Sequence, residues 1–124
     1  LIWGGGGQVE NYCSMGVFDG DELIAGTLFH NHYVQEGLME LTSASKSRRW
    51  LTKPVIRAMF SLPFDLFDCQ ICVIRVSSKN DVMLRIARSF GFSEYVIPRL
   101  RGRDENEHVF TLTDDQWKKH KVNK

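Results

Sequence analysis

The sequence predicts an α/β (α+β) fold built on one mixed β-sheet, and three observations lead to this fold class. Three strand-like runs follow one another in the first half of the chain, separated only by short turns. The apolar residues then change to helical spacing before a further buried strand, as expected for a parallel strand–helix–strand crossover. A second helix and two more strands follow, so helices and strands are mixed along the chain.

The first three strands are expected at residues 12–18, 22–33 and 38–44. The turn signal at 19–21 joins the first two as a hairpin, and 35–37 forms the next turn. Gly26 lies inside the long second strand and predicts a bulge or bend there. These strands form an antiparallel meander. Before them, the four glycines at 4–7 lack the Lys-Ser/Thr of a phosphate-binding P-loop and are read as a flexible connection.

The crossover helix is expected to begin at Pro54, because proline is tolerated in a first helical turn and apolar residues recur from there at helical spacing. Pro63 should end or kink it. The apolar, β-branched run at 69–77 then predicts a buried strand that lies parallel to the strand at 38–44.

The second helix has clear signals at both ends, since Asn80 is a favourable N-cap and Gly91 a favourable stop. Strands at 92–100 and 108–113 should follow, joined by a polar turn at 101–107. Thr113 and Gln116 have the spacing of a capping box for a short last helix.

The composition is that of an ordinary globular domain, with 124 residues, 43% hydrophobic, 25% charged and a formal net charge of +1. The length supports one compact unit, so we expect residues 1–124 to form a single domain. The small net charge gives no argument for binding to nucleic acid or an acidic membrane. No apolar run reaches the roughly 18 residues of a membrane helix. We therefore expect no membrane partner.

Three cysteines, at 13, 69 and 72, do not suggest a disulfide framework, and a reducing, cytoplasmic compartment fits better. Cys69 and Cys72 have the spacing of a zinc or redox motif. No second pair completes a zinc site, and residues three apart on a strand point to opposite faces. We expect two buried cysteines, no metal and no disulfide.

Two segments of the sequence resemble the GNAT (Gcn-type N-acetyltransferase) superfamily over roughly 12–113. NDVMLRIARSFGF at 80–92 looks like the family's helix that an Asn opens after the fifth strand and that ends in Gly-Phe. RRWLTK at 48–53 lies where the family has its glycine-rich loop before a helix. The Arg-Trp-Leu-Thr stretch and His30-Asn31 are similar to a GNAT-like subgroup found in bacteriophages. The family's N-terminal elements would be shortened or missing.

The sequence also departs from the family pattern. Trp50 and Thr52, or Leu51 and Lys53, replace the two loop glycines. The tyrosine that many members use as general acid corresponds to Ala87. These departures leave the fold expectation unchanged but weaken the expectation of activity.

The resemblance implies an acetyl-CoA site at the loop before the first helix. Unpaired N–H groups at a helix N-terminus favour phosphate, and basic side chains add to this. The pantetheine arm would pair with strand backbone beside the Asn that opens the second helix, although that Asn is equally well explained as a cap. The expected cofactor-binding residues are Thr42, Ser43, Ala44, Arg48, Arg49, Trp50, Leu51, Thr52, Lys53 and Asn80.

Transfer of an acetyl group to an amine requires a base for the amine proton, and His30 and Glu40 are the expected catalytic residues. Imidazole titrates near working pH, with a reference pKa of about 6.5. Glu40 stands in an otherwise apolar strand, where a charged side chain is unusual and suggests a functional role. An ion pair with an arginine would explain its presence equally well. Simple alternation places His30 and His32 on one face of their strand.

Two functional interpretations follow. The first is an N-acetyltransferase that moves an acetyl group from acetyl-CoA to an unidentified primary amine, in a bacterial or phage-infected cell. The second is a non-catalytic GNAT-like structural or interaction protein. A homodimer is compatible with either. The basic run at 99–103 could contact nucleic acid, but the acidic residues at 104–107 predict that it neutralises itself.

Overall fold

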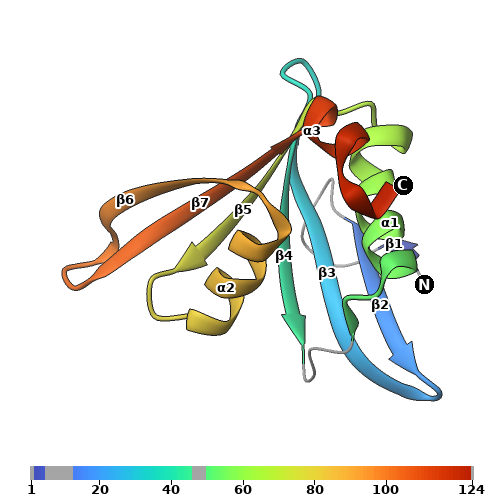
Figure 1. Cartoon of the computed structure of the whole chain (residues 1–124), viewed down its shortest axis with the longest axis horizontal. Helices are drawn as coiled ribbons and strands as arrows, with labels where there is room; N and C mark the ends of the chain where they lie inside the picture. Colours follow the sequence, from blue (N-terminus) through green and yellow to red (C-terminus); the bar gives the residue numbers. More distant parts are fainter. Residues whose placement is uncertain (1, 5–12, 46–49, 124) are drawn as a thin grey trace.

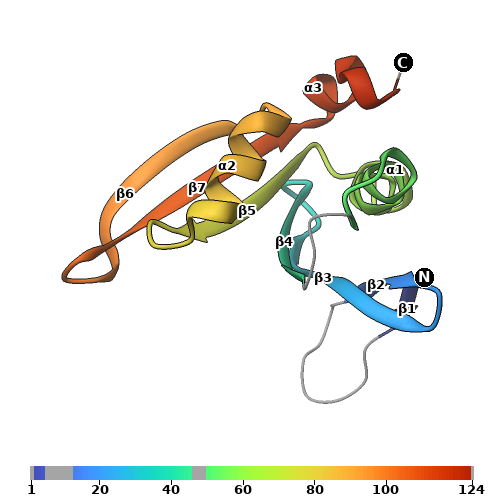
Figure 2. The same cartoon turned by 60° about the horizontal axis from the view of Figure 1, so that its bottom comes forward.

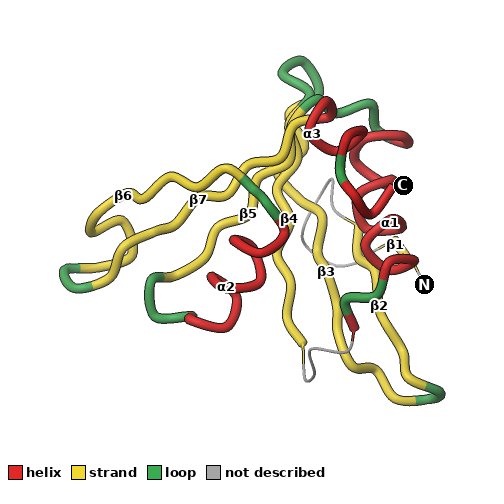
Figure 3. The backbone as a smooth tube through the Cα atoms, viewed as in Figure 1, coloured by secondary structure: helices red, strands yellow, loops and turns green. Residues whose placement is uncertain are grey.

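The computed structural model describes residues 2–4, 13–45 and 50–123, and the side chains of 14–44 and 50–123. Figure 1 shows one twisted sheet with helices packed against it, coloured in the order of the sequence, and Figure 3 distinguishes the helices, strands and loops. The strands are β1 (Ile2–Gly4), β2 (Cys13–Asp19), β3 (Glu22–Tyr33), β4 (Leu38–Ser45), β5 (Ile71–Ser77), β6 (Ser93–Gly102) and β7 (Glu105–Thr113). The helices are α1 (Lys53–Ser61), η2 (Leu62–Leu66), α2 (Asp81–Phe90), α3 (Asp114–Lys119) and η3 (Lys121–Asn123).

The predicted mixed sheet is confirmed, with strand order β1-β2-β3-β4-β5-β7-β6. β2, β3 and β4 form the expected antiparallel meander. Gly26 itself pairs in regular register with Gly16, but the β2–β3 pairing shifts beside it, between Val17 and Phe18, opposite Ala25 and Leu23. A second shift lies in the β3–β4 pairing between His30 and Tyr33, where Asn31 has a φ of +50°. Asn tolerates this left-handed conformation better than most residues.

β4 and β5 are parallel, as the crossover pattern predicted, but they pair over only part of their length. Leu38 to Leu41 pair with Ile71 to Ile74. Beyond these pairs the two strands diverge towards their C-terminal ends, which is visible in the middle of Figure 1. The divergence opens the sheet at its centre, although β4 stays paired with β3 and β5 stays paired with β7.

The α-helices lie on one face of the sheet, as Figure 2 shows. Phe60 of α1 packs in a core with Cys72 of β5, whereas Leu84 of α2 packs in a second core with Val76 of β5. Residues four apart on a strand share a face, so α1 and α2 cover the same side. We name this the helical face. Among the described residues, no helix covers the opposite, open face.

The caps explain where these helices begin and end. The Thr52 hydroxyl accepts a hydrogen bond from the Val55 N–H, and the Asn80 side chain accepts one from the Met83 N–H at 3.2 Å. Gly91 ends α2 with a φ of +101°, which favours glycine. The predicted capping box of Thr113 and Gln116 is present at α3.

The predicted bounds of the last hairpin are wrong. β6 and β7 continue to Gly102 and from Glu105, so the turn is much shorter than the expected 101–107. The Arg101 guanidinium lies 2.8 Å from the Glu107 carboxylate across the strands. The β6–β7 pairing is irregular between Ile97 and Gly102, and this cross-strand ion pair spans the irregular stretch. The same pair supports the expectation that this basic run neutralises itself.

Both described cysteines are free and buried, as expected. The reasoning about their faces was wrong, however, because Cys69 precedes β5 and packs in the same core as Cys72. Burial raises the pKa of both thiols, so the reactive thiolate is disfavoured.

An ion-paired triad fastens α2 to the last hairpin. Arg88 donates two hydrogen bonds to the Glu94 carboxylate, at 2.9 and 2.8 Å, and His108 Nδ1 lies 2.7 Å from Glu94 Oε2. The hydrogen bond from Arg88, followed by the one from His108, lowers the pKa of Glu94 to about 2.

Stability should therefore depend on pH through Glu94. Because its pKa is lower in the folded chain, Glu94 stabilises the fold above its ordinary pKa of 4.5, and this contribution is lost as pH falls towards 2. We expect the Glu94→Gln variant to show a flatter decrease of the free energy of unfolding between these pH values, measured by urea titration. Asp21→Asn, in the exposed β2–β3 turn, is the control. Equal slopes in the two variants would contradict the assignment.

Candidate active site

The opening between β4 and β5 leaves backbone without a strand partner at the centre of the sheet. Beyond Leu41, β4 pairs only with β3, through Thr42, Ser43, Ala44 and Ser45. Its other edge therefore presents peptide groups to the gap, and such groups require hydrogen-bond partners when they are covered. An extended ligand with amide groups could supply those partners.

A cluster of polar side chains lies beside this gap on the open face. His30 Nε2 and Thr42 Oγ1 are 2.8 Å apart, in a hydrogen bond whose direction follows the histidine tautomer. Glu40 accepts a hydrogen bond of 3.0 Å from Asn31 and lies 3.9 Å from His30 Nε2. Its carboxylate is also 3.5 Å from the Arg75 guanidinium. We name these five residues the open-face cluster.

Strand geometry explains how the cluster forms. His30 is directly opposite Glu40 in the β3–β4 ladder, so the two side chains share the open face. The shift at Asn31 changes the alternation beyond it. His32 consequently packs its ring against Phe67, with centroids 5.2 Å apart. The expectation that His30 and His32 share one face is therefore wrong.

A cleft of about 420 Å³ lies on the helical side of the gap. It brings together four of the predicted cofactor-binding residues, from β4, the loop before α1 and the start of α2. We name it the wedge cleft, and it is lined by Ser43, Ala44, Trp50, Asn80, Val82, Met83 and Ile86.

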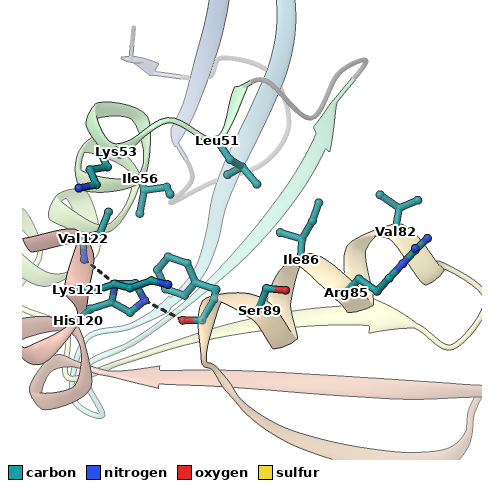
Figure 4. Close-up of a pocket in the computed structure, with 11 residues that line it drawn as sticks. Leu51, Lys53, Ile56, Val82, Arg85, Ile86, Ser89, His120, Lys121 and Val122 are labelled. Atoms are coloured by element: carbon teal, nitrogen blue, oxygen red, sulfur yellow. Dashed lines mark hydrogen bonds between the residues drawn. The ribbon is translucent and has the colours of Figure 1, made fainter.

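A larger cleft, of about 640 Å³, lies between α1, α2 and the C-terminal segment. It shares Val82 and Ile86 with the wedge cleft, so the two are neighbours. Figure 4 shows its apolar floor and three basic side chains around it, from Lys53, Arg85 and Lys121. We name it the helix cleft; Leu51, Ile56, Ser89, Phe90, His120 and Val122 complete its lining.

His120 holds the C-terminal wall of the helix cleft in place. Its Nε2 donates to the Phe90 carbonyl at 2.8 Å, and its Nδ1 accepts from the Val122 N–H at 3.1 Å, as the dashed lines in Figure 4 show. The ring also stacks on Phe90, with centroids 4.1 Å apart. These bonds require the neutral imidazole.

Two polar groups of the wedge cleft have donor capacity left over. The indole N–H of Trp50 is buried and has no hydrogen-bond partner in the described part of the chain. The Asn80 side chain uses its carbonyl oxygen as the cap of α2, which leaves its NH₂ group for a ligand. Unpaired buried donors are costly, so a ligand with carbonyl oxygens would suit this cleft.

The structure thus divides the predicted residues between the two sides of the gap. Ser43, Ala44, Trp50 and Asn80 line the wedge cleft, and Leu51 and Lys53 line the helix cleft. Thr52 caps α1, whereas Arg48 and Arg49 lie outside the described residues. His30, Glu40 and the Thr42 side chain lie on the open face.

Sequence reasoning missed Arg75, Arg85 and Lys121. Arg75 could have been found by the observation that singled out Glu40, because it is also a lone charged residue in an apolar strand. No such signal marked Arg85 or Lys121, because exposed basic residues on helices are ordinary and only the fold brings these two to one cleft.

No protein-family model matches the chain, and no protein of curated function matches it in sequence. Solved structures do match its fold. A candidate acetyltransferase from T. thermophilus matches with a TM-score of 0.75 and 13% identity, over 93% of this chain and 64% of that one. A variant of spermidine N-acetyltransferase from Vibrio cholerae matches with a TM-score of 0.72 and 14% identity, over 88% and 69%. A candidate GNAT-family acetyltransferase from Chromobacterium violaceum gives 0.71 and 20%, over 88% and 62%.

The fold is therefore that of the GNAT acetyltransferases, as the sequence resemblance implied. The chain spans 64% of the length of the T. thermophilus structure and 62% of the C. violaceum one. In the described part of the chain, no helix is long and apolar enough to cross a membrane.

Proposed function

We propose that the protein is an N-acetyltransferase that transfers an acetyl group from acetyl-CoA to a primary amine. One observation carries this proposal: the gap between β4 and β5 has ligand-sized clefts on its helical side and a proton-accepting cluster on its open side. A thioester reaching through the gap would meet an amine arriving from the other face.

The residues of the helical side fit acetyl-CoA. The free edge of β4 and the unpaired donors of Trp50 and Asn80 match the amides of a pantetheine arm. The helix cleft offers Lys53, Arg85 and Lys121 for phosphate groups, beside the N-terminus of α1. Arg48 and Arg49 precede this helix and would add to the charge.

The reaction needs a neutral amine. The amine nitrogen attacks the thioester carbonyl carbon, a C–N bond forms, and the C–S bond breaks with its electron pair passing to sulfur. The amine proton passes to Glu40 or to His30, directly or through one water. The thiolate then takes up a proton from water, because the Ala87 position, which corresponds to the family's usual acid, carries no acidic group. A thiol is acidic enough to leave without strong assistance.

The competing function is a non-catalytic GNAT-like interaction protein. Two observations favour it: buried Trp50 occupies the loop where the resemblance expects glycine, and Ala87 of α2, at the position of the family's usual acid, is fully buried in the second core. The organised cluster of Glu40 with His30, Asn31 and Arg75 favours the enzyme. The likeness to a bacteriophage subgroup and a cytoplasmic location remain part of the proposal, and reduced, buried thiols agree with that location. A homodimer is compatible with either function.

The deciding experiment is incubation with acetyl-CoA and a panel of primary amines, followed by detection of free thiol. Amine-dependent thiol release supports the proposal. Binding of acetyl-CoA without release for any amine would favour the interaction protein.

CoA binding should weaken with salt, because charged groups hold the phosphates. We expect Arg48→Ala combined with Arg49→Ala to lower the affinity by about tenfold, as loss of charge-assisted hydrogen bonds would do. Isothermal titration calorimetry measures this directly. The matched control is Arg103→Ala combined with Lys119→Ala, which removes two exposed cations that line neither cleft. No heat and no thermal shift at millimolar CoA would refute the cofactor assignment.

A further inference from the structure

Arg75 is the charged residue of the open-face cluster that takes no part in the proton transfer of the proposed reaction. It lies on β5, directly beyond the last residue that pairs with β4, and so at the mouth of the gap. Alternation along β5 turns Cys72 and Val76 to the helical face and Arg75 to the open face. An arginine here stands beside the place where the acceptor amine would react.

The guanidinium of Arg75 is poorly satisfied. Within the described part of the chain, its one ion-pair partner is Glu40, at 3.5 Å, and no side-chain hydrogen bond is formed. Its side chain is 51% exposed, whereas that of Glu40 is 12% exposed. Arginine can offer a planar, two-pronged set of N–H donors to a carboxylate or phosphate, and most of this capacity is unused.

The neighbouring carboxylates are already paired. Three strands lie beside the gap or continue the sheet from it, namely β4, β5 and β7. Besides Glu40, the carboxylates that they carry on the open face are those of Glu105 and Glu107. Glu107 is buried and bound by Arg101, and Glu105 is bound by Ser77 and Lys79. A polycationic acceptor would find no unpaired carboxylate on these three strands, whereas an anionic group would find Arg75.

We propose, building on the acetyltransferase function above, that the acceptor is an amine with a carboxylate close to it, as in an amino acid, and that Arg75 binds this carboxylate. The amine would then lie at Glu40 and His30 while the carboxylate is held by the guanidinium next to them. This fixes both ends of a short acceptor at the mouth of the gap.

The test compares each of several amino acids with its carboxamide and with the amine that lacks the carboxylate, using kcat/KM for thiol release. We expect the carboxylate form to be preferred by about tenfold or more, and this preference to be lost in Arg75→Gln. Arg75→Lys, which keeps the charge but not the planar donors, should retain part of it. Arg103→Gln, at the exposed hairpin turn, should retain all of it. The ratio of the two substrates separates this role from a structural one, which would lower both rates alike.

Two further acceptors define the charge requirement. O-phosphoethanolamine tests whether a phosphate serves in place of the carboxylate, and a preference for it over amino acids would overturn the carboxylate assignment. Spermidine tests a polycation. Turnover of spermidine or of the carboxamides at rates equal to those of the amino acids would overturn the inference and leave the acetyltransferase function standing. No thiol release with any amine would overturn both.

Discussion

Glu40→Gln is expected to lower kcat/KM for acetyl transfer by about a hundredfold, within the range measured for removal of a positioned base. The amide has nearly the same shape as the carboxylate and can still bond Asn31, but it cannot accept a proton. The Glu40 carboxylate is held by Asn31 at 3.0 Å and by Arg75 at 3.5 Å, so its position is fixed beside the gap. Steady-state thiol release at saturating acetyl-CoA measures the effect.

The control for this prediction is Glu107→Gln, which removes another buried carboxylate that is paired with an arginine. It should change stability without a comparable loss of rate. His30→Ala tests the second candidate base, since His30 lies 3.9 Å from Glu40 and could pass the proton onward. Full turnover in both Glu40→Gln and His30→Ala would show that the enzyme acts by positioning an amine that is already neutral.

The elements that the sequence predicted well are those set by local chemistry. Asn80, Gly91 and the Thr113–Gln116 pair act within one helical turn of their own positions, so their roles can be read from neighbouring residues. The meander and the parallel crossover were likewise visible in the change from one hydrophobic period to another. The strand of residues 22–33 was predicted at its observed bounds.

The errors have a different origin, because they depend on partners far along the chain. The polar run at 101–107 has the composition of a turn, but Gly102 pairs with Glu105 and Arg101 forms an ion pair with Glu107 across the two strands. The shift at Asn31 separates His30 from His32, and no residue pattern marked it in advance. Arg75 joins the candidate site only because β5 lies parallel to β4 and diverges from it just there. The division of the site between two faces of the sheet could not be seen before the fold was known.

Phe60→Ala should destabilise the fold by about 3–5 kcal/mol, the cost typical of deleting a buried aromatic ring. Phe60 is 1% exposed, and its ring lies 5.1 to 6.3 Å from the rings of Phe64, Phe90, Phe92 and Trp117. These rings come from η2, the end of α2, the residue before β6 and α3, so one side chain joins most elements of the helical face.

Urea unfolding followed by circular dichroism measures this loss. Phe60→Leu should recover part of it, because a smaller cavity costs less. Leu66→Ala, at a side chain that is 69% exposed, should change the free energy of unfolding by no more than about 0.5 kcal/mol. A loss at Phe60 as small as the one at Leu66 would mean that the aromatic cluster does not hold the helices to the sheet. Phe60 packs against Phe90, and Phe90 also lines the helix cleft. The Phe60→Leu variant should therefore bind CoA more weakly while its fold is retained.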